Sequence, residues 1–283
     1  MDCTIGFGGH SESIIKKLNT EGLLIGLDLD PYALNKTKKK LSQFNKNISL
    51  HNCCYSVFPQ ILEKLGISKI DGFLFDFGIS SYQIDSGPRG FSYMRNAPLD
   101  MRFNNQDSKL KTAENIINSI SESELSAALK NYGDLREHSR ISKCIITARN
   151  NNNINTTFEL KEAIRNALPY ENIKKISVVF QVVRILVNNE INTIKNTLKK
   201  TIGHLKIGGR IAIISFHSIE DRIVKHFFKD QIIYKNSSYE IEYEDIGTKI
   251  KVLTKKPLIE SKENLKKNPR SRSAKLRVAE RMK

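Results

Sequence analysis

The chain has 283 residues, 39% of them hydrophobic, which is enough to bury a substantial core in about two structural units. Its 46 Lys and Arg residues against 30 Asp and Glu give a net charge of +16, which favours RNA, DNA or an acidic membrane surface as partner, although a Lys-rich surface of biased composition would give the same charge. With no run of about 18 apolar residues and no basic-then-apolar leader, the sequence predicts neither a membrane span nor a secretory signal, and the cytoplasm is the default location.

The beginning of the chain alternates short apolar runs with amphipathic stretches, which is the pattern of a parallel sheet with crossover helices. The apolar runs predict strands at residues 23–29, 48–51 and 70–77. The amphipathic stretches predict helices at residues 11–18, 31–44 and 58–65. The same alternation returns later as a helix at 191–205, a turn at Gly208 and Gly209, a strand at 210–216 and a helix at 219–228.

The middle of the chain has a different character, with helical patterns and no convincing strand. The predicted helices are 112–118, 121–131, 136–150 and 156–167. Ser121 with Glu124, and Thr156 with Glu159, match the capping box that satisfies the free amides of a first helical turn. We therefore predict an α/β domain in two parts, residues 1–103 and 176–283, with an all-helical insertion at 104–175 and a basic C-terminal tail.

A glycine-rich segment near the beginning is the first candidate binding element. Gly6, Gly8 and Gly9 precede a predicted helix, and glycines there let the backbone approach a ligand closely, although such a turn can also merely reverse the chain. Asp28 stands at the end of the first predicted strand, where nucleotide-binding sheets place a carboxylate that accepts hydrogen bonds from ribose hydroxyls. The segment lacks a phosphate-loop ending and departs from G-x-G-x-x-G, so an adenosine ligand without phosphates, such as S-adenosylmethionine, fits best.

A second carboxylate, Asp76, ends the third predicted strand and precedes a small, hydroxyl-rich loop at residues 78–81. Ligands of an open parallel sheet lie at the carboxyl ends of its strands, so Gly8, Asp28 and Asp76 are expected to converge on one pocket. Asp76 could instead cap a helix or order its loop.

The cysteines do not indicate a metal centre. Cys3, Cys53, Cys54 and Cys144 show no C-x-x-C spacing, and no two histidines stand four residues apart. His51 with Cys53 and Cys54 offers only three candidate ligands on one extended stretch. A small buried thiol pair is the better interpretation, and we predict no metal site.

Several long motifs, spread over almost the whole chain, resemble those of the RsmH (MraW) family of ribosomal RNA cytosine-N4 methyltransferases. They are residues 6–11 (GFGGHS), 76–83 (DFGISSYQ), 89–95 (RGFSYMR), 98–102 (PLDMR), Phe180-Gln181 with Arg184, 214–222 (ISFHSIEDR) and 268–277 (NPRSRSAKLR). The resemblance implies a class I (Rossmann-like) S-adenosylmethionine-dependent methyltransferase fold with a helical domain inserted. It also implies methyl transfer to the exocyclic N4 amine of a cytosine in the decoding region of small-subunit (16S) rRNA.

The resemblance also implies cofactor contacts. Carried over by position, they fall on Gly8, Gly9 and His10 for the methionine end, Asp28 for the ribose, Tyr55 and Asp76 around the adenine, and Gln83 in the next loop. Asp76 is also the candidate catalytic residue, since oxygen acceptors at residues 76–80 would bind the amino protons of the cytosine and balance its growing positive charge. The alternative is that Asp76 only holds the cofactor. An aromatic that only fills the core is the alternative for Tyr55.

Basic residues are the candidates for holding the RNA, and the helical insertion is the candidate RNA-recognition domain. They are Arg89, Arg95, Arg102, Arg270, Arg272, Lys275 and Arg277. His217 is a candidate for the substrate side, although a hydrogen-bonded structural histidine is the commoner outcome. Each cation could equally be a solvated surface charge.

Relatives in this family carry an extra segment and a first strand before the glycine loop, so we expect a truncated beginning. The predicted partner is small-subunit rRNA, with no membrane, and the oligomeric state is not predicted. Rival readings are a methyltransferase of another RNA or DNA base, a non-catalytic RNA-binding ribosome assembly factor and, more remotely, a nicotinamide oxidoreductase.

Overall fold

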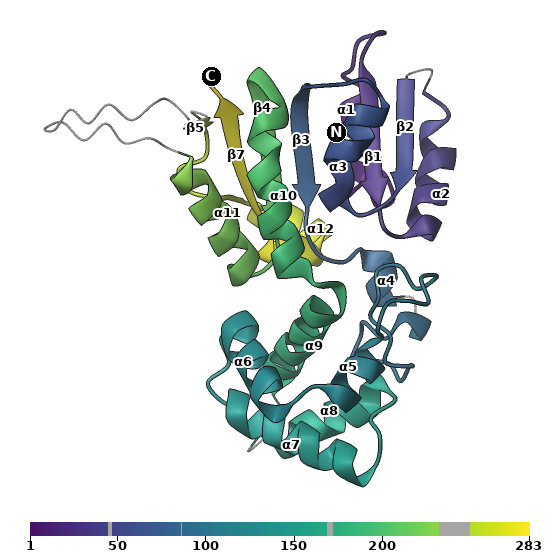
Figure 1. The fold of residues 1–283 in the computed structure, drawn as a ribbon, viewed down its shortest axis with the longest axis vertical. Coiled ribbons are helices and arrows are strands. Elements are labelled where there is room, and N and C mark those ends of the chain that lie inside the picture. The colour runs from purple at the N-terminus through teal and green to yellow at the C-terminus, as the bar shows by residue number, and fades with distance from the viewer. Residues whose placement is uncertain (45–46, 86, 169–171, 232–249) are drawn as a thin grey trace, which may run out of the picture. The chain divides into compact units, whose positions relative to one another are not determined.

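The computed structural model describes residues 1–44, 47–85, 87–168, 172–231 and 250–283 and divides the chain into two compact units (Figure 1). The sheet unit consists of Met1–Gly78 and Asn192–Lys283, and the helical unit is the segment between them, Ile79–Ile191. The predicted fold, an α/β domain interrupted by a helical insertion, is therefore confirmed. Within the described ranges, no helix is both long and apolar enough to cross a membrane.

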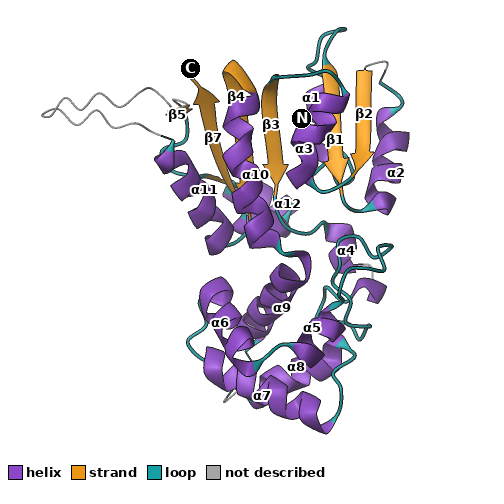
Figure 2. Cartoon of the chain, viewed as in Figure 1, coloured by secondary structure: helices purple, strands orange, loops and turns teal. Residues whose placement is uncertain are grey.

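Parallel strands form the centre of the sheet unit. β1 (Leu23–Asp28) pairs with β2 (Asn47–Asn52), and β3 (Ile70–Asp76) pairs with β4 (Leu205–Ser215), each pair in parallel register. Asp2 bridges β1 and β3, so the first residues of the chain connect the two pairs (Figure 2). As a result, β1 and β3 end at the same edge of the sheet, which we call the carboxyl edge.

Beyond β4 the sheet becomes antiparallel. β7 (Lys275–Arg281) pairs with β4, and the short strands β5 (Ile250–Val252) and β6 (Leu258–Ile259) pair with β7. The prediction of a basic tail for residues 268–277 is therefore wrong in its second half. Lys, Arg and Glu conceal the strand in the sequence, because only alternate positions of β7 face the interior.

The helices that connect or cover these strands agree with the predicted ones to within a few residues, except for α12, which was not predicted. They are α1 (Gly9–Ile15), α2 (Pro31–Leu41), α3 (Phe58–Lys64), α10 (Glu190–His204), α11 (Ser218–Asp230) and α12 (Lys262–Lys267). Short 3₁₀ turns, η1 (Tyr55–Val57) and η3 (Pro269–Ser273), lie at two of the connections. The predicted turn at Gly208 and Gly209 lies inside β4, where Gly208 has a φ of 78°.

The sheet is buried on both faces, which explains its nearly continuous apolar strands. In β1, Leu24 packs with residues of α1 and α2, whereas Ile25 and Leu27 join the larger core that includes α3, α10 and α11. All three leucine and isoleucine side chains are at most 2% exposed. This packing fixes the position of the loop that follows β1.

The helical unit forms a separate core. Its helices are α4 (Ser81–Asp85), α5 (Ala113–Ser119), α6 (Glu122–Gly133), α7 (His138–Asn151), α8 (Thr157–Asn166) and α9 (Ile173–Asn188), and a 3₁₀ turn, η2, spans Gly87–Arg89. Both predicted capping boxes are present: the Ser121 and Thr156 hydroxyls accept the amides of Glu124 and Glu159, whose carboxylates accept in return. The first turns of α6 and α8 are therefore satisfied locally.

The predicted boundaries of the insertion, residues 104–175, are too narrow on both sides. Leu99 and Met101 belong to the same buried cluster as the helices, and so do Phe180 and Val183 of α9. α9 was not predicted from the sequence, although its polar residues Lys174, Ser177, Gln181, Arg184 and Asn188 recur at helical spacing. The domain divisions after residues 103 and 175 are corrected accordingly to those of the compact units.

Candidate active site

The glycine loop lies at the carboxyl edge and connects the segment that begins at Asp2, which bridges β1 and β3, to the start of α1. Gly6 and Gly8 have φ values of 50° and 72°, a left-handed conformation that favours glycine. A Cβ on Gly8 would lie 2.9 Å from Cγ2 of Thr37, and the Thr37 hydroxyl donates to the carbonyl of Gly6 at 2.6 Å. The loop is thus held against α2 at a distance that only glycine permits.

Asp28 fixes the same loop from the end of β1. Its Oδ2 accepts the backbone N–H of Gly6 at 2.7 Å, and its Oδ1 accepts that of Asp30 at 2.8 Å. Burial raises the pKa of the Asp28 carboxyl to about 6, against the smaller opposing effect of these hydrogen bonds. The carboxylate is therefore a desolvated acceptor beside the glycine loop.

Asp76 reaches the loop from the end of β3. Its backbone N–H donates to Oγ1 of Thr4 at 2.7 Å, and its Oδ2 lies 3.4 Å from Nε2 of His10. The hydrogen bond with Asp76 raises the pKa of His10, against the opposing effect of burial. The other oxygen of Asp76, Oδ1, is buried and has no hydrogen-bond partner among the described residues. A buried acceptor without a donor is costly, so this atom is suited to a ligand donor.

The structure thus brings together three elements that are far apart in the sequence. The loop at Gly6–His10 contacts Asp28 through a backbone amide and Asp76 through an imidazole, all within the sheet unit. Gly9, by contrast, has no positive φ, and a Cβ there would meet nothing within 4 Å. Its backbone is therefore accessible rather than crowded.

Tyr55 lies in η1, after β2. Its ring packs edge-on against Phe75 at 5.8 Å and is tilted against Phe77 at 6.0 Å, and it is half-buried at the border of the sheet core. The core-filling alternative for Tyr55 is thus part of its role. Its half-exposed side remains accessible to a ligand.

Gln83 belongs to the helical unit. Its side-chain Oε1 accepts the backbone N–H of Ser80 at 3.0 Å, and its backbone N–H donates to the Ser80 hydroxyl at 3.2 Å. The side chain is buried and closes the turn that begins α4. Both of these contacts lie within the helical unit.

The predicted RNA contacts of the helical unit fare unequally. Arg89 is only 8% exposed and donates to the backbone carbonyls of Arg102 and Phe103 at 2.8 Å, so its assignment as a phosphate contact is corrected to a structural role. Arg102 forms a bidentate pair with Asp100, at 2.7 and 2.8 Å. Arg95 is exposed and donates to the Asp85 carbonyl at 2.7 Å.

His217 caps α11. Its Nδ1 accepts the N–H of Glu220 at 3.4 Å, and the fully buried Glu220 carboxylate in turn accepts the N–H of Phe216 at 2.8 Å. These contacts fit the structural alternative for His217. Its Nε2, which lies 3.0 Å from Oε1 of Glu220, is buried and makes no hydrogen bond with the described residues, so a role on the substrate side stays a prediction.

Two partners of the site were missed from sequence. Thr4 and Ser11 flank the glycine loop, and the Ser11 hydroxyl donates to the buried carboxylate of Asp2 at 2.6 Å. Both hydroxyls act on residues that bridge or end strands. Proximity to the glycines was the only available signal, and it does not identify a partner that lies on another strand.

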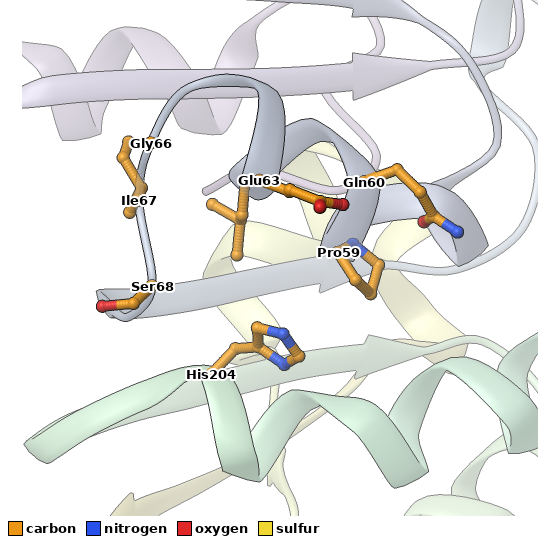
Figure 3. Close-up of a pocket in the computed structure, with 8 residues that line it drawn as sticks. Pro59, Gln60, Glu63, Gly66, Ile67, Ser68 and His204 are labelled. Carbon is orange, nitrogen blue, oxygen red and sulfur yellow. The ribbon is translucent and has the colours of Figure 1, made fainter.

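A pocket of about 600 Å³ lies elsewhere in the sheet unit, where His204 at the end of α10 faces Pro59 and Glu63 of α3 (Figure 3). His204 packs edge-on against Phe58 and its Nδ1 lies 2.8 Å from the carbonyl of Lys200. No predicted site residue lines this pocket.

The residues at the carboxyl edge fit S-adenosylmethionine. The desolvated Asp28 carboxylate supplies an acceptor for ribose hydroxyls, and the glycine loop supplies close backbone approach without a phosphate-binding sequence. An open parallel sheet with such an edge defines a Rossmann-like protein that binds an adenosine-containing ligand.

Comparison with known proteins narrows this class. The chain matches the MraW methylase family model over residues 1–282 and belongs to that family. A protein of Clostridium botulinum (strain Kyoto / Type A2) called ribosomal RNA small subunit methyltransferase H is 44% identical, over 98% of this chain and 91% of the relative. Proteins of the same name from Clostridioides difficile (strain 630) and Halothermothrix orenii are each 42% identical, over 100% of this chain and 92% of the relative. The chain is thus an S-adenosylmethionine-dependent methyltransferase.

Proposed function

We propose that this protein transfers the methyl group of S-adenosylmethionine to the exocyclic N4 amine of a cytosine in the decoding region of small-subunit rRNA. Family membership and the name that the relatives share support this substrate. The structural observation that carries the chemistry is the buried, unpartnered Oδ1 of Asp76 beside the glycine loop. An rRNA substrate also makes the cytoplasm the expected location.

The cofactor supplies a methyl group bonded to a sulfonium, which is an electrophile without help from the protein. The residues proposed to hold it are Gly8, Gly9 and His10 at its methionine end, Asp28 at its ribose, Tyr55 and Asp76 at its adenine side, and Gln83. The ionised Asp28 carboxylate has lone pairs in addition to those that accept Gly6 and Asp30, so it can also accept from a diol.

The nucleophile is the difficult partner in this reaction. The lone pair of the cytosine N4 nitrogen is delocalised into the ring, so the amine attacks poorly. An acceptor that binds an amino hydrogen localises the lone pair and stabilises the positive charge that develops on nitrogen. We assign this role to Asp76, whose His10 contact orients one oxygen and leaves the other for a donor.

The substrate base must also be accessible. N4 lies on the pairing edge of cytosine, so the base must be unpaired or turned out of its stack before it reaches a carboxylate at the sheet edge. We propose that the helical unit, Ile79–Ile191, takes part in recognising the RNA, with Arg95 as its exposed candidate contact.

Labelled S-adenosylmethionine and small ribosomal subunits that lack the modification test the proposal. We expect the label on N4 of one cytosine of the rRNA when the labelled nucleotide is mapped. A label on another base would replace the proposal with a different methyltransferase. Cofactor binding with no transfer to any ribosomal particle would replace it with an RNA-binding assembly factor.

Asp76→Asn tests the role of the carboxylate. We expect methyl transfer to fall by at least about 100-fold, which is the typical loss when one preorganised electrostatic group is removed. Asp71→Asn is the matched control, because Asp71 lies at the other end of β3, where its side chain is 85% exposed. Full activity of Asp76→Asn at unchanged cofactor affinity would refute the charge role.

A further inference from the structure

The basic residues near the end of the chain fall into two structurally different groups. Lys275 and Arg277 of β7 pair with Asp221 of α11, at 3.3 and 2.7 Å, and the Arg277 side chain is only 9% exposed. Burial alone would raise the pKa of Asp221, but the hydrogen bonds and charges of Arg277 and Lys275 outweigh it and lower that pKa. These two cations hold β7 against α11. The buried Arg277 is thereby corrected to a structural role, whereas Lys275, whose side chain is 38% exposed, stays a predicted phosphate contact.

The second group lies just before β7. Lys266 and Lys267 end α12, Arg270 and Arg272 lie in η3, and all four side chains are exposed. Among the described residues, no carboxylate forms an ion pair with Lys266, Lys267 or Arg272. The two acidic residues nearby, Glu260 and Glu263, precede or begin α12, and Glu260 accepts from Ser261 and Asn264. The positive charges of Lys266, Lys267 and Arg272 therefore face solvent.

The position of this group follows from strand pairing. Ile259 of β6 pairs with Lys275 of β7, so the segment between them leaves the sheet and returns at a single point. Lys275 also pairs with Ser215 at the end of β4, and the preceding residue Ile214 pairs with Asp76. The segment thus projects from the carboxyl edge (Figure 1). In the sheet, β4 lies between β7 and the strand of Asp76, so β7 is about 10 Å from that strand.

We infer that Lys266, Lys267, Arg270 and Arg272 form a phosphate-binding surface for the RNA that carries the target base; we call it the α12–η3 surface. The inference rests on the proposed function and extends it to the means by which the substrate is held. A membrane fits this surface less well, because interfacial helices need an apolar face and α12, with the sequence KENLKK, offers one half-buried leucine.

The test measures the salt dependence of binding to an unmodified small-subunit rRNA transcript. Each phosphate contact contributes about 0.7 to 0.9 to the slope of log affinity against log salt concentration. The double variant Lys266→Gln/Lys267→Gln should therefore lower the slope by about 1.4 to 1.8. Lys266→Arg/Lys267→Arg should retain it.

Lys199→Gln/Lys200→Gln is the matched control. These two lysines are also adjacent and exposed, but they lie near the C-terminus of α10, which leads into the opposite end of β4. The control should leave the slope unchanged, and cofactor affinity and thermal unfolding should be unchanged in all three variants. Equal losses in both Gln variants would reduce the effect to net charge and overturn the inference, as would no loss in either.

Two further measurements distinguish the inference from membrane binding and from the proposed function. Loss of binding to anionic phospholipid vesicles, with RNA binding intact, would assign the α12–η3 surface to a membrane and overturn the inference. A native protein that methylates no ribosomal particle, while the Lys266→Gln/Lys267→Gln slope falls as expected, would overturn the proposed function but support the surface. Methyl transfer by the native protein, with an unchanged slope in Lys266→Gln/Lys267→Gln, would support the proposed function but overturn the α12–η3 surface.

Discussion

At the scale of single residues, Asp28 titrates in an accessible range. Its pKa in the folded protein is about 6, above the ordinary value of 3.8, so the folded protein binds this proton more tightly than the unfolded chain does. The contribution of Asp28 to stability is therefore greatest below about pH 4 and is lost as the pH rises through about 6. Its ability to accept ribose hydroxyls follows the opposite trend, because it requires the ionised form.

We accordingly expect the affinity for S-adenosylmethionine to fall by up to about tenfold per pH unit below pH 6. Calorimetric titration from about pH 5 to about pH 7.5 measures this dependence. Asp28→Asn should bind more weakly and remove that part of the dependence. Any pH dependence of the affinity that remains in Asp28→Asn would come from His10, whose pKa is raised by Asp76. A native affinity that is constant over the whole range would contradict the assignment.

Gly8 and Gly9 give a paired prediction of opposite sign. Gly8→Ala places a side chain in the left-handed region and against Thr37, so we expect a loss of about 2 kcal/mol in the free energy of unfolding. Gly9→Ala meets no neighbour at the start of α1 and should stabilise the protein by up to about 1 kcal/mol. Urea unfolding of both variants measures the difference, and equal effects would refute the conformational argument.

At the scale of elements, a buried ion pair joins α9 to α10. Arg184 donates to both carboxylate oxygens of Glu190 at 2.8 and 2.9 Å, and the two side chains are 10% and 6% exposed. Between the helices, Asn189 adopts a left-handed φ of 47° that ends α9. The pair thus lies at the turn by which the chain leaves the helical unit.

Glu190→Gln removes one charge and leaves the guanidinium buried without its counterion. We expect a loss of about 3 kcal/mol in the free energy of unfolding. The exposed pair of Arg165 and Glu162, 3.1 Å apart, is the control, since Glu162→Gln should cost less than about 0.5 kcal/mol. Denaturant unfolding compares the two, and a small loss in Glu190→Gln would show that the buried pair contributes little.

How well an element could be predicted from sequence depended on how local its determinants are. The capping boxes at Ser121 and Thr156 are complete within four residues, so the sequence predicts them fully. β7 is defined by pairing with β4 and by the contact of Arg277 with Asp221, 56 residues away. No local pattern encodes such a partner, and the charges of β7 therefore suggested a tail.

At the scale of the whole molecule, the same distinction applies to the candidate site. The glycine loop, Asp28 and Asp76 could be predicted, because parallel strands end at one edge and carry loop residues there. The contact of His10 with Asp76 and the hydroxyl of Thr4 could not, because each joins positions more than sixty residues apart. The net charge of +16 likewise did not indicate which cations are buried in pairs, such as Arg277, and which face solvent.

Because Ile259 pairs with Lys275, the conformation of the segment between them does not affect the pairing of the strands. Because its entrance and exit lie side by side, residues can be added, removed or recharged within it without shifting the alignment of any strand. Such a segment is suited to transplantation between homologues. Substitutions in this segment would change the affinity for a nucleic acid without moving the residues at the carboxyl edge that take part in methyl transfer.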